Sequence, residues 1–133
     1  MRSADQFAKL RRKRPCVVAV IDDDESVRES VVGLIESVGH CVTFFRSAEE
    51  FLNSAEVNTV ACMIVDVRLP GISGLDLFSQ MRANQQSIPT IFITAHAVFA
   101  SQPDLQEGAV DCLLKPFSET VLLEALKRAL KLK

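Results

Sequence analysis

Five short, mostly apolar runs recur along the chain, separated by longer segments with a different periodicity. The runs show little alternation with polar residues, and they cover residues 16–21, 41–45, 60–65, 90–94 and 111–114. Continuous apolar runs of this length are typical of strands that are buried on both faces of a parallel sheet. We therefore predict five strands at these positions.

Between the runs, apolar residues recur every three or four positions, which is the spacing of an amphipathic helix. Ser47 with Glu50, Ser73 and Ser118 are suitable helix starts, and Gly39 is a suitable C-terminal cap. The predicted helices cover residues 27–38, 47–52, 73–81 and 118–130.

The segment between residues 94 and 111 is the irregular part of this pattern, because Pro103 lies in its middle. Proline inside a helix costs about 3 kcal/mol, but it costs little at the first helical position. We expect a short helix that starts near Pro103, or a kinked helix, before Gly108.

Strands that alternate with helices imply right-handed crossovers and a parallel sheet with helices on both faces. The chain has 133 residues, of which 48% are hydrophobic, and this suits one α/β domain. No apolar stretch approaches the roughly 20 residues that span a bilayer, and the charged N-terminus lacks the apolar region of a signal peptide. We therefore expect a cytoplasmic protein without membrane contact.

Charge divides the chain into two parts. Residues 1–14 contain six basic side chains and one acidic side chain, for a charge of +5, so the remainder carries −7 of the overall −2. Such an acidic domain is a poor binder of nucleic acid. We expect a solvated basic extension over residues 1–14 and one domain over residues 15–133.

The four cysteines, at positions 16, 41, 62 and 112, show no spacing that suits a zinc site. Each lies in or beside an apolar run. We therefore expect buried, reduced thiols rather than disulfides.

Polar residues stand where four of the predicted strands end: Asp22 with Asp23, then Asp66, Thr94 and Lys115. In a parallel sheet these ends lie at one edge, where open α/β folds bind ligands. Crowded carboxylates repel one another unless a cation intervenes, and their hard oxygen atoms suit Mg²⁺. A carboxylate beside Mg²⁺ can attack a phosphoryl group, with a lysine offsetting the charge that develops. Asp24 fits the first turn of the following helix better than the metal.

Four motifs in order resemble those of one known family. They are Ile21-Asp22-Asp23-Asp24, the loop from Asp66 to Gly74, Thr94-Ala95, and Lys115-Pro116-Phe117. Together they resemble the receiver (CheY-like) domain of bacterial two-component response regulators, nearest to the FixJ-like subgroup, from about residue 16 to residue 132. The resemblance implies a three-layer, doubly wound α/β fold with five parallel strands in the order 2-1-3-4-5.

The resemblance also implies roles for the acidic residues. Asp66 would accept a phosphoryl group from the phosphohistidine of a sensor histidine kinase. Asp23, Asp66 and the backbone carbonyl of Arg68 would bind Mg²⁺ directly, and Asp22 would help through water. Arg68 and His96 stand at the positions that tune phosphoryl lifetime in this family.

The remaining motif residues would act on the phosphate. Lys115 would pair with it, and Thr94 would move to hydrogen-bond it. The peptide between Lys115 and Pro116 is expected to be cis. Members of this subgroup usually carry a DNA-binding output domain, which would lie outside this chain, and a homodimer on phosphorylation is a further expectation.

Two departures from the family pattern leave alternatives open. Cys112 stands where the family usually has an aromatic switch residue, and the segment with Pro103 is one residue short. A receiver fold that serves as a scaffold with impaired switching is therefore one alternative. A small phosphatase of the haloacid-dehalogenase type, with Asp22 as its nucleophile, is the other. It rests on different residues, because Asp22-Asp23-Asp24 also resembles a DxD motif after a strand, with Thr94 and Lys115 as later motifs.

Overall fold

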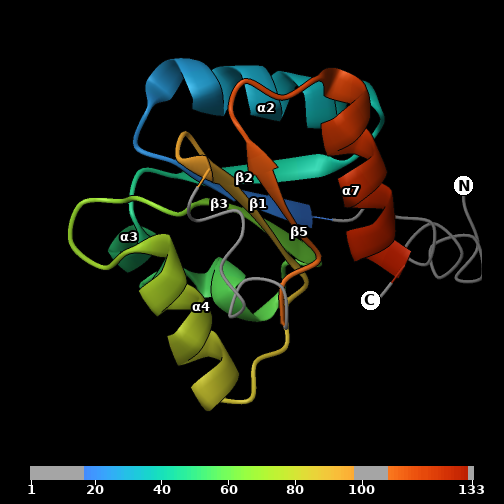
Figure 1. The fold of residues 1–133 in the computed structure, drawn as a ribbon. Coiled ribbons are helices and arrows are strands. Elements are labelled where there is room, and N and C mark those ends of the chain that lie inside the picture. The colour runs from blue at the N-terminus through green and yellow to red at the C-terminus, as the bar shows by residue number, and fades with distance from the viewer. Residues whose placement is uncertain (1–16, 98–107, 132–133) are drawn as a thin grey trace, which may run out of the picture.

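The computed structural model describes residues 17–97 and 108–131, and within them it forms a five-stranded sheet (Figure 1). All neighbouring strands are parallel, and their order is β2-β1-β3-β4-β5. The strands are β1 (Val17–Ile21), β2 (Cys41–Phe45), β3 (Cys62–Asp66), β4 (Thr90–Thr94) and β5 (Asp111–Leu114). The predicted doubly wound α/β fold is confirmed.

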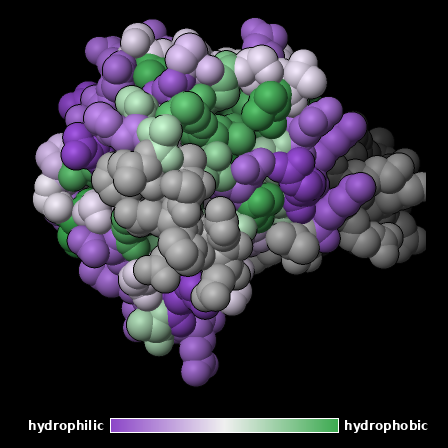
Figure 2. Space-filling view, viewed as in Figure 1, coloured by the Kyte–Doolittle hydropathy of each residue, from purple (hydrophilic) through white to green (hydrophobic). Residues whose placement is uncertain are grey.

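Helices cover both faces of this sheet. Helices α2 (Glu25–Ser37) and α7 (Glu119–Lys131) pack on one face, and α3 (Ala48–Leu52) and α4 (Gly74–Ala83) pack on the other (Figure 1). A short 3-10 helix, η1 (Ala55–Asn58), was not predicted. On the face seen in Figure 2, apolar side chains gather where α2 approaches the start of α7.

The core has two halves because successive strand residues point to opposite faces of the sheet. Every residue of β3 and of β4 is buried. In β3, Met63 and Val65 join the half under α3 and α4, whereas Ile64 joins the half under α2 and α7. This double burial explains why the central strands read as continuous apolar runs.

Local signals start and end the helices as predicted. The side-chain oxygens of Ser47 and Ser73 accept hydrogen bonds from backbone N–H groups in the first turns of α3 and α4. The Ser118 hydroxyl does the same at the start of α7. Gly39 follows α2 with a φ of 94°, a left-handed conformation that glycine adopts without strain.

Some expectations turn out differently or lie outside the described residues. Cys62 is buried and reduced as expected, but the expectation is wrong for Cys41, which is exposed because it opens the edge strand β2. Cys16, Pro103 and the basic segment 1–14 lie outside the described residues. The Lys115–Pro116 peptide is cis, as expected. Among the described residues, no helix is long and apolar enough to cross a membrane.

Candidate functional site

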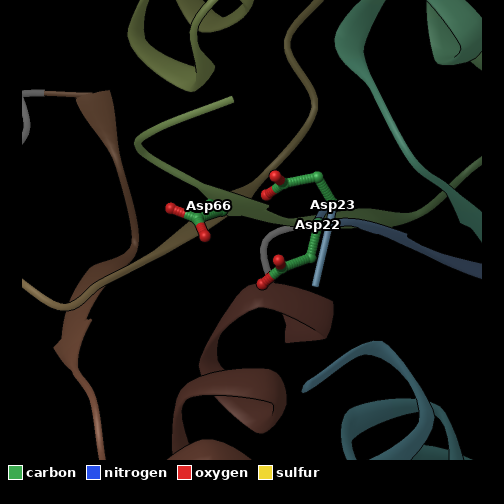
Figure 3. Close-up of side chains that lie close together, drawn as sticks. All are labelled: Asp22, Asp23 and Asp66. Atoms are coloured by element: carbon green, nitrogen blue, oxygen red, sulfur yellow. The ribbon is translucent and has the colours of Figure 1, made fainter. Parts of the chain in front are cut away.

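Three carboxylates meet at the carboxyl edge of the sheet. Asp22 and Asp23 follow β1, and Asp66 is the last residue of β3, the strand beside it. Each of the three offers a carboxylate oxygen, and these oxygens all lie within 4.8 Å of one another (Figure 3). Asp22 is fully buried and Asp66 is 8% exposed, whereas Asp23 is exposed to solvent.

Lys115, which follows β5, reaches across the edge to two of these carboxylates. Its Nζ lies 3.0 Å from Asp66 Oδ2 and 3.4 Å from Asp22 Oδ2. Partial burial disfavours the charged ammonium, but the hydrogen bond to Asp66 and the two negative charges outweigh it, so the pKa of Lys115 is raised. Lys115 therefore stays protonated at neutral pH.

Burial has the opposite consequence for Asp22. Loss of solvent around its carboxylate raises its pKa, and the nearby charge of Asp66 adds to the effect. The backbone N–H of Asp24, which donates to Asp22 Oδ1 at 2.9 Å, and the Lys115 ammonium counteract part of the rise. The cluster thus holds excess negative charge that a bound cation would relieve.

The loop after Asp66 is held from two sides. Asp66 Oδ1 accepts a hydrogen bond of 2.9 Å from the Arg68 N–H. Further along, Glu49 Oε2 on α3 accepts one of 3.1 Å from the Ile72 N–H. Gly71 has a φ of 76°, and a Cβ there would lie 2.2 Å from Glu49 Oε2. These contacts determine the course of the backbone that carries the Arg68 carbonyl.

Thr94 is buried at the end of β4, but its hydroxyl belongs to a local turn. Its Oγ1 accepts a hydrogen bond of 3.1 Å from the His96 N–H. The backbone N–H of Lys115 donates to the Thr94 carbonyl at 2.7 Å, which ties the ends of β4 and β5 together. Above the edge, Arg68 Nη1 lies 3.2 Å from His96 Nε2.

The structure therefore brings Asp22, Asp23, Asp66 and Lys115 into one cluster and places Thr94 at the same edge. Arg28 and Glu49 hold the two loops of the site, and neither was predicted as a site residue from the sequence. A signal for Arg28 was present, because it lies three and seven residues before the buried Val31 and Ile35 on one face of α2. Glu49 gave no such signal, since its partner is 23 residues away.

The residues present fit a divalent cation that prefers oxygen ligands. The three carboxylates supply hard oxygen atoms, and the exposure of Asp23 leaves the cluster open to water. Mg²⁺ typically combines one or two carboxylates with several retained waters, and so it suits this arrangement. Asp24 points its carboxylate elsewhere: its Oδ1 caps α2 by accepting from the N–H groups of Ser26 and Val27.

A doubly wound α/β domain with an acidic cluster and a lysine at its carboxyl edge defines the class of CheY-like domains. Residues 18–127 match the family described as "Response regulator receiver domain". The chain therefore belongs to the response regulator receiver family, as its motifs predicted.

Relatives and solved structures agree with this assignment. The chain is 41% identical over 120 residues to the response regulator protein TodT of Pseudomonas putida, covering 90% of this chain and 53% of that protein. It is 40% identical over 114 residues to the transcriptional regulatory protein FixJ of Azorhizobium caulinodans, covering 85% and 54%. The solved structure of FixJ-N superposes with a TM-score of 0.77 at 34% identity, covering 89% of this chain and 95% of that one.

The chain spans about half the length of the curated relatives that it matches. It corresponds to their receiver portion, because the family match covers residues 18–127. The activities of the full-length relatives outside this portion are therefore only proposed for this protein.

Proposed function

We propose that Asp66 accepts a phosphoryl group from the phosphohistidine of a sensor histidine kinase, and that this event switches a signalling or transcriptional output. The observation that carries the proposal is the convergence of Asp22, Asp23 and Asp66 within 4.8 Å, with Lys115 Nζ 3.0 Å from Asp66. Such a cluster is suited to bind a cation and a phosphoryl group together.

We assign Mg²⁺ to this cluster, with Asp22, Asp23, Asp66 and the Arg68 carbonyl as the groups that hold it. When bound, Mg²⁺ supplies positive charge that stabilises the transferring phosphoryl oxygens. Membership of the receiver family supports this assignment of Mg²⁺, because receiver domains share this acidic pocket.

Asp66, Lys115 and Thr94 would each have a different role in the phosphoryl transfer. An Asp66 carboxylate oxygen forms a bond to phosphorus while the bond to the kinase histidine nitrogen breaks, and that nitrogen keeps the electron pair. Lys115 offsets the charge on the phosphoryl oxygens. The Thr94 hydroxyl, which now accepts from the His96 N–H, would turn to donate to a phosphoryl oxygen. This rotation of the hydroxyl would couple phosphorylation of Asp66 to the backbone that follows β4.

The proposed partners follow from the relatives. FixJ is named a transcriptional regulatory protein, and this chain matches only about half of it, so we propose a DNA-binding output domain outside residues 1–133. The receiver itself, over residues 15–133, would not bind nucleic acid, and residues 1–14 would form a basic extension. A cytoplasmic location suits the kinase partner, and phosphorylation would favour a homodimer.

The kinase would approach beside Lys115. A hollow between α2 and the start of α7 is lined by Val27, Leu34, Lys115 and Phe117 (Figure 2). An apolar hollow that adjoins the acceptor cluster suits a partner helix that places its phosphohistidine near Lys115. The domain would act as a phosphoacceptor that assists its own phosphorylation and dephosphorylation, not as an independent enzyme.

The test is phosphorylation by a small donor. Incubation with acetyl phosphate and Mg²⁺ should give one phosphate adduct by intact mass, and Asp66→Asn should remove it. An unchanged adduct on Asp66→Asn, or none on the wild type, would contradict the proposal. An adduct mapped to Asp22 would instead support a haloacid-dehalogenase-type phosphatase.

A second measurement separates a switch from a scaffold. Beryllofluoride with Mg²⁺ should shift the NMR signals of residues 108–114, around Cys112, as well as those of the site. Binding without shifts in this segment would favour a receiver-fold scaffold with impaired switching.

A further inference from the structure

Arg28 on α2 carries a charge that is largely buried. It is 7% exposed, and within the described part of the chain its guanidinium forms no salt bridge. Its contacts are neutral: Nη1 donates to the Asp22 carbonyl oxygen at 3.0 Å, and the guanidinium lies 5.5 Å from the centroid of the Phe44 ring. Burying a charge is costly unless it is paired and hydrogen-bonded, and one carbonyl and one aromatic ring offset only part of that cost here.

The contact with Arg28 completes a set of hydrogen bonds around one residue, Asp22. The Asp22 N–H donates to the Phe45 carbonyl on β2 at 3.1 Å, and Asp22 Oδ1 accepts from the Asp24 N–H at 2.9 Å. The Asp22 carbonyl, which belongs to the peptide joining Asp22 to Asp23, is held by Arg28. Rotation of that peptide would change the direction of the Asp23 side chain, which is exposed and lacks burial to orient it.

We propose that Arg28 is a positioning residue for the cation site. By holding the Asp22 carbonyl it keeps the Asp22–Asp23 peptide in one orientation, and so it aims the Asp23 carboxylate toward Asp66. Phe44 on β2 holds the guanidinium in place through a cation–π contact. The inference rests on the proposed function, because it takes the acidic cluster to be the Mg²⁺ site.

Charge and geometry make opposite predictions for this residue, which makes the inference testable. If Arg28 acted only through its charge, its removal would strengthen Mg²⁺ binding, because a positive charge near the site repels a cation. If it acts by positioning, its removal weakens binding despite that gain. Arg46 provides a matched control, because it is exposed and lines the same hollow as Arg28 and Phe44.

The experiment measures the Mg²⁺ dissociation constant by calorimetry, since the chain has no Trp or Tyr to serve as a fluorescent probe. Arg28→Met should raise the constant about tenfold or more, as is usual when the group that orients a metal ligand is removed. Arg28→Lys keeps a donor and should recover part of the loss. Arg46→Met should leave the constant unchanged or lower it.

Urea unfolding of each variant separates this effect from loss of stability, because a merely destabilised protein binds Mg²⁺ normally while it is folded. Wild-type affinity in Arg28→Met, or equal weakening in Arg46→Met, would overturn the inference. If Arg28→Met does not fold, Phe44→Leu decides, and wild-type affinity there would overturn it. Absence of Mg²⁺ binding by the wild type would instead overturn the proposed site and the inference with it.

Discussion

Asp22, Asp23 and Asp24 are adjacent and chemically alike, yet each has a different environment. Asp22 is fully buried beside Lys115, Asp23 is exposed at the acidic cluster, and Asp24 caps α2. The contrast arises because successive residues leave β1 in different directions before α2 begins. Substitutions at the three positions should therefore separate stability from metal binding.

Asp24→Ala should lower the free energy of unfolding, because the N–H groups of Ser26 and Val27 lose their acceptor. Its Mg²⁺ dissociation constant should stay near the wild-type value. Asp23→Ala should show the reverse, with stability retained and Mg²⁺ binding lost. Urea unfolding and calorimetry on both variants check this, and equal effects in the two would contradict the assignment.

Asp22 gives a prediction about pH. Because burial raises its pKa in the folded state, the ionised carboxylate costs stability. The contribution of this group is most favourable below its usual pKa of 3.8, and it declines as the pH rises through the raised value. Without metal, Asp22→Asn should therefore be more stable than the wild type at pH 7, by about 1 kcal/mol.

The gain from Asp22→Asn should shrink as the pH is lowered through the raised pKa of Asp22, because the wild-type carboxyl then becomes neutral. Urea unfolding in a chelator across this range measures it. A variant that is less stable than the wild type at pH 7 would show that the pair with Lys115 outweighs the cost of burial.

At the scale of elements, the approach of α4 to β3 sets the geometry around Asp66. Gly74, the first residue of α4, lies so close that a Cβ there would be 2.2 Å from the Asp66 carbonyl oxygen and 3.0 Å from its carbonyl carbon. Backbone atoms cannot move away as a flexible side chain can. The absence of a side chain at Gly74 therefore lets the helix begin directly behind the acceptor.

Gly74→Ala should lower the free energy of unfolding by about 1–3 kcal/mol, because the added methyl group forces the two backbones apart. It should also weaken Mg²⁺ binding, since Asp66 moves with β3. Gly33→Ala in α2 is the matched control: nothing lies within 4 Å of its Cβ position. That substitution should stabilise the protein by about 0.5–1 kcal/mol, because glycine is unfavourable inside a helix.

At the scale of the molecule, the acidic cluster should link metal binding to folding. Its carboxylates come from the ends of β1 and β3, and the lysine that joins them follows β5, so the site exists only when the sheet is assembled. A cation that binds the folded state alone stabilises it by mass action.

Mg²⁺ at 100 times its dissociation constant should raise the free energy of unfolding by about 2.7 kcal/mol. Thermal unfolding with and without the metal measures the effect, and Na⁺ salt at the same ionic strength in place of the Mg²⁺ salt is the control. Asp23→Ala should abolish the increase. An equal increase in that variant would place the stabilising site elsewhere.

Much of this protein was predictable from its sequence. The apolar runs and helical periods identified the five strands and their helices, because strands buried on both faces are apolar throughout, whereas helices buried on one face are apolar every three or four residues. The polar residues at the strand ends then predicted the cluster, since parallel strands bring their carboxyl ends to one edge. The sequence also carried the caps at Ser47, Ser73 and Ser118, which depend on neighbours a few residues away.

Only the tertiary structure decided how these residues interact. The burial of Asp22 against the exposure of Asp23, and the exposure of Cys41 at a sheet edge, depend on what packs nearby. Glu49 and Ile72 are 23 residues apart, and Lys115 and Asp22 are 93 apart. Periodicity records which face of an element is buried, but it does not record which distant residue lies opposite. The order of the strands and the packing of α2 and α3 on them settle that.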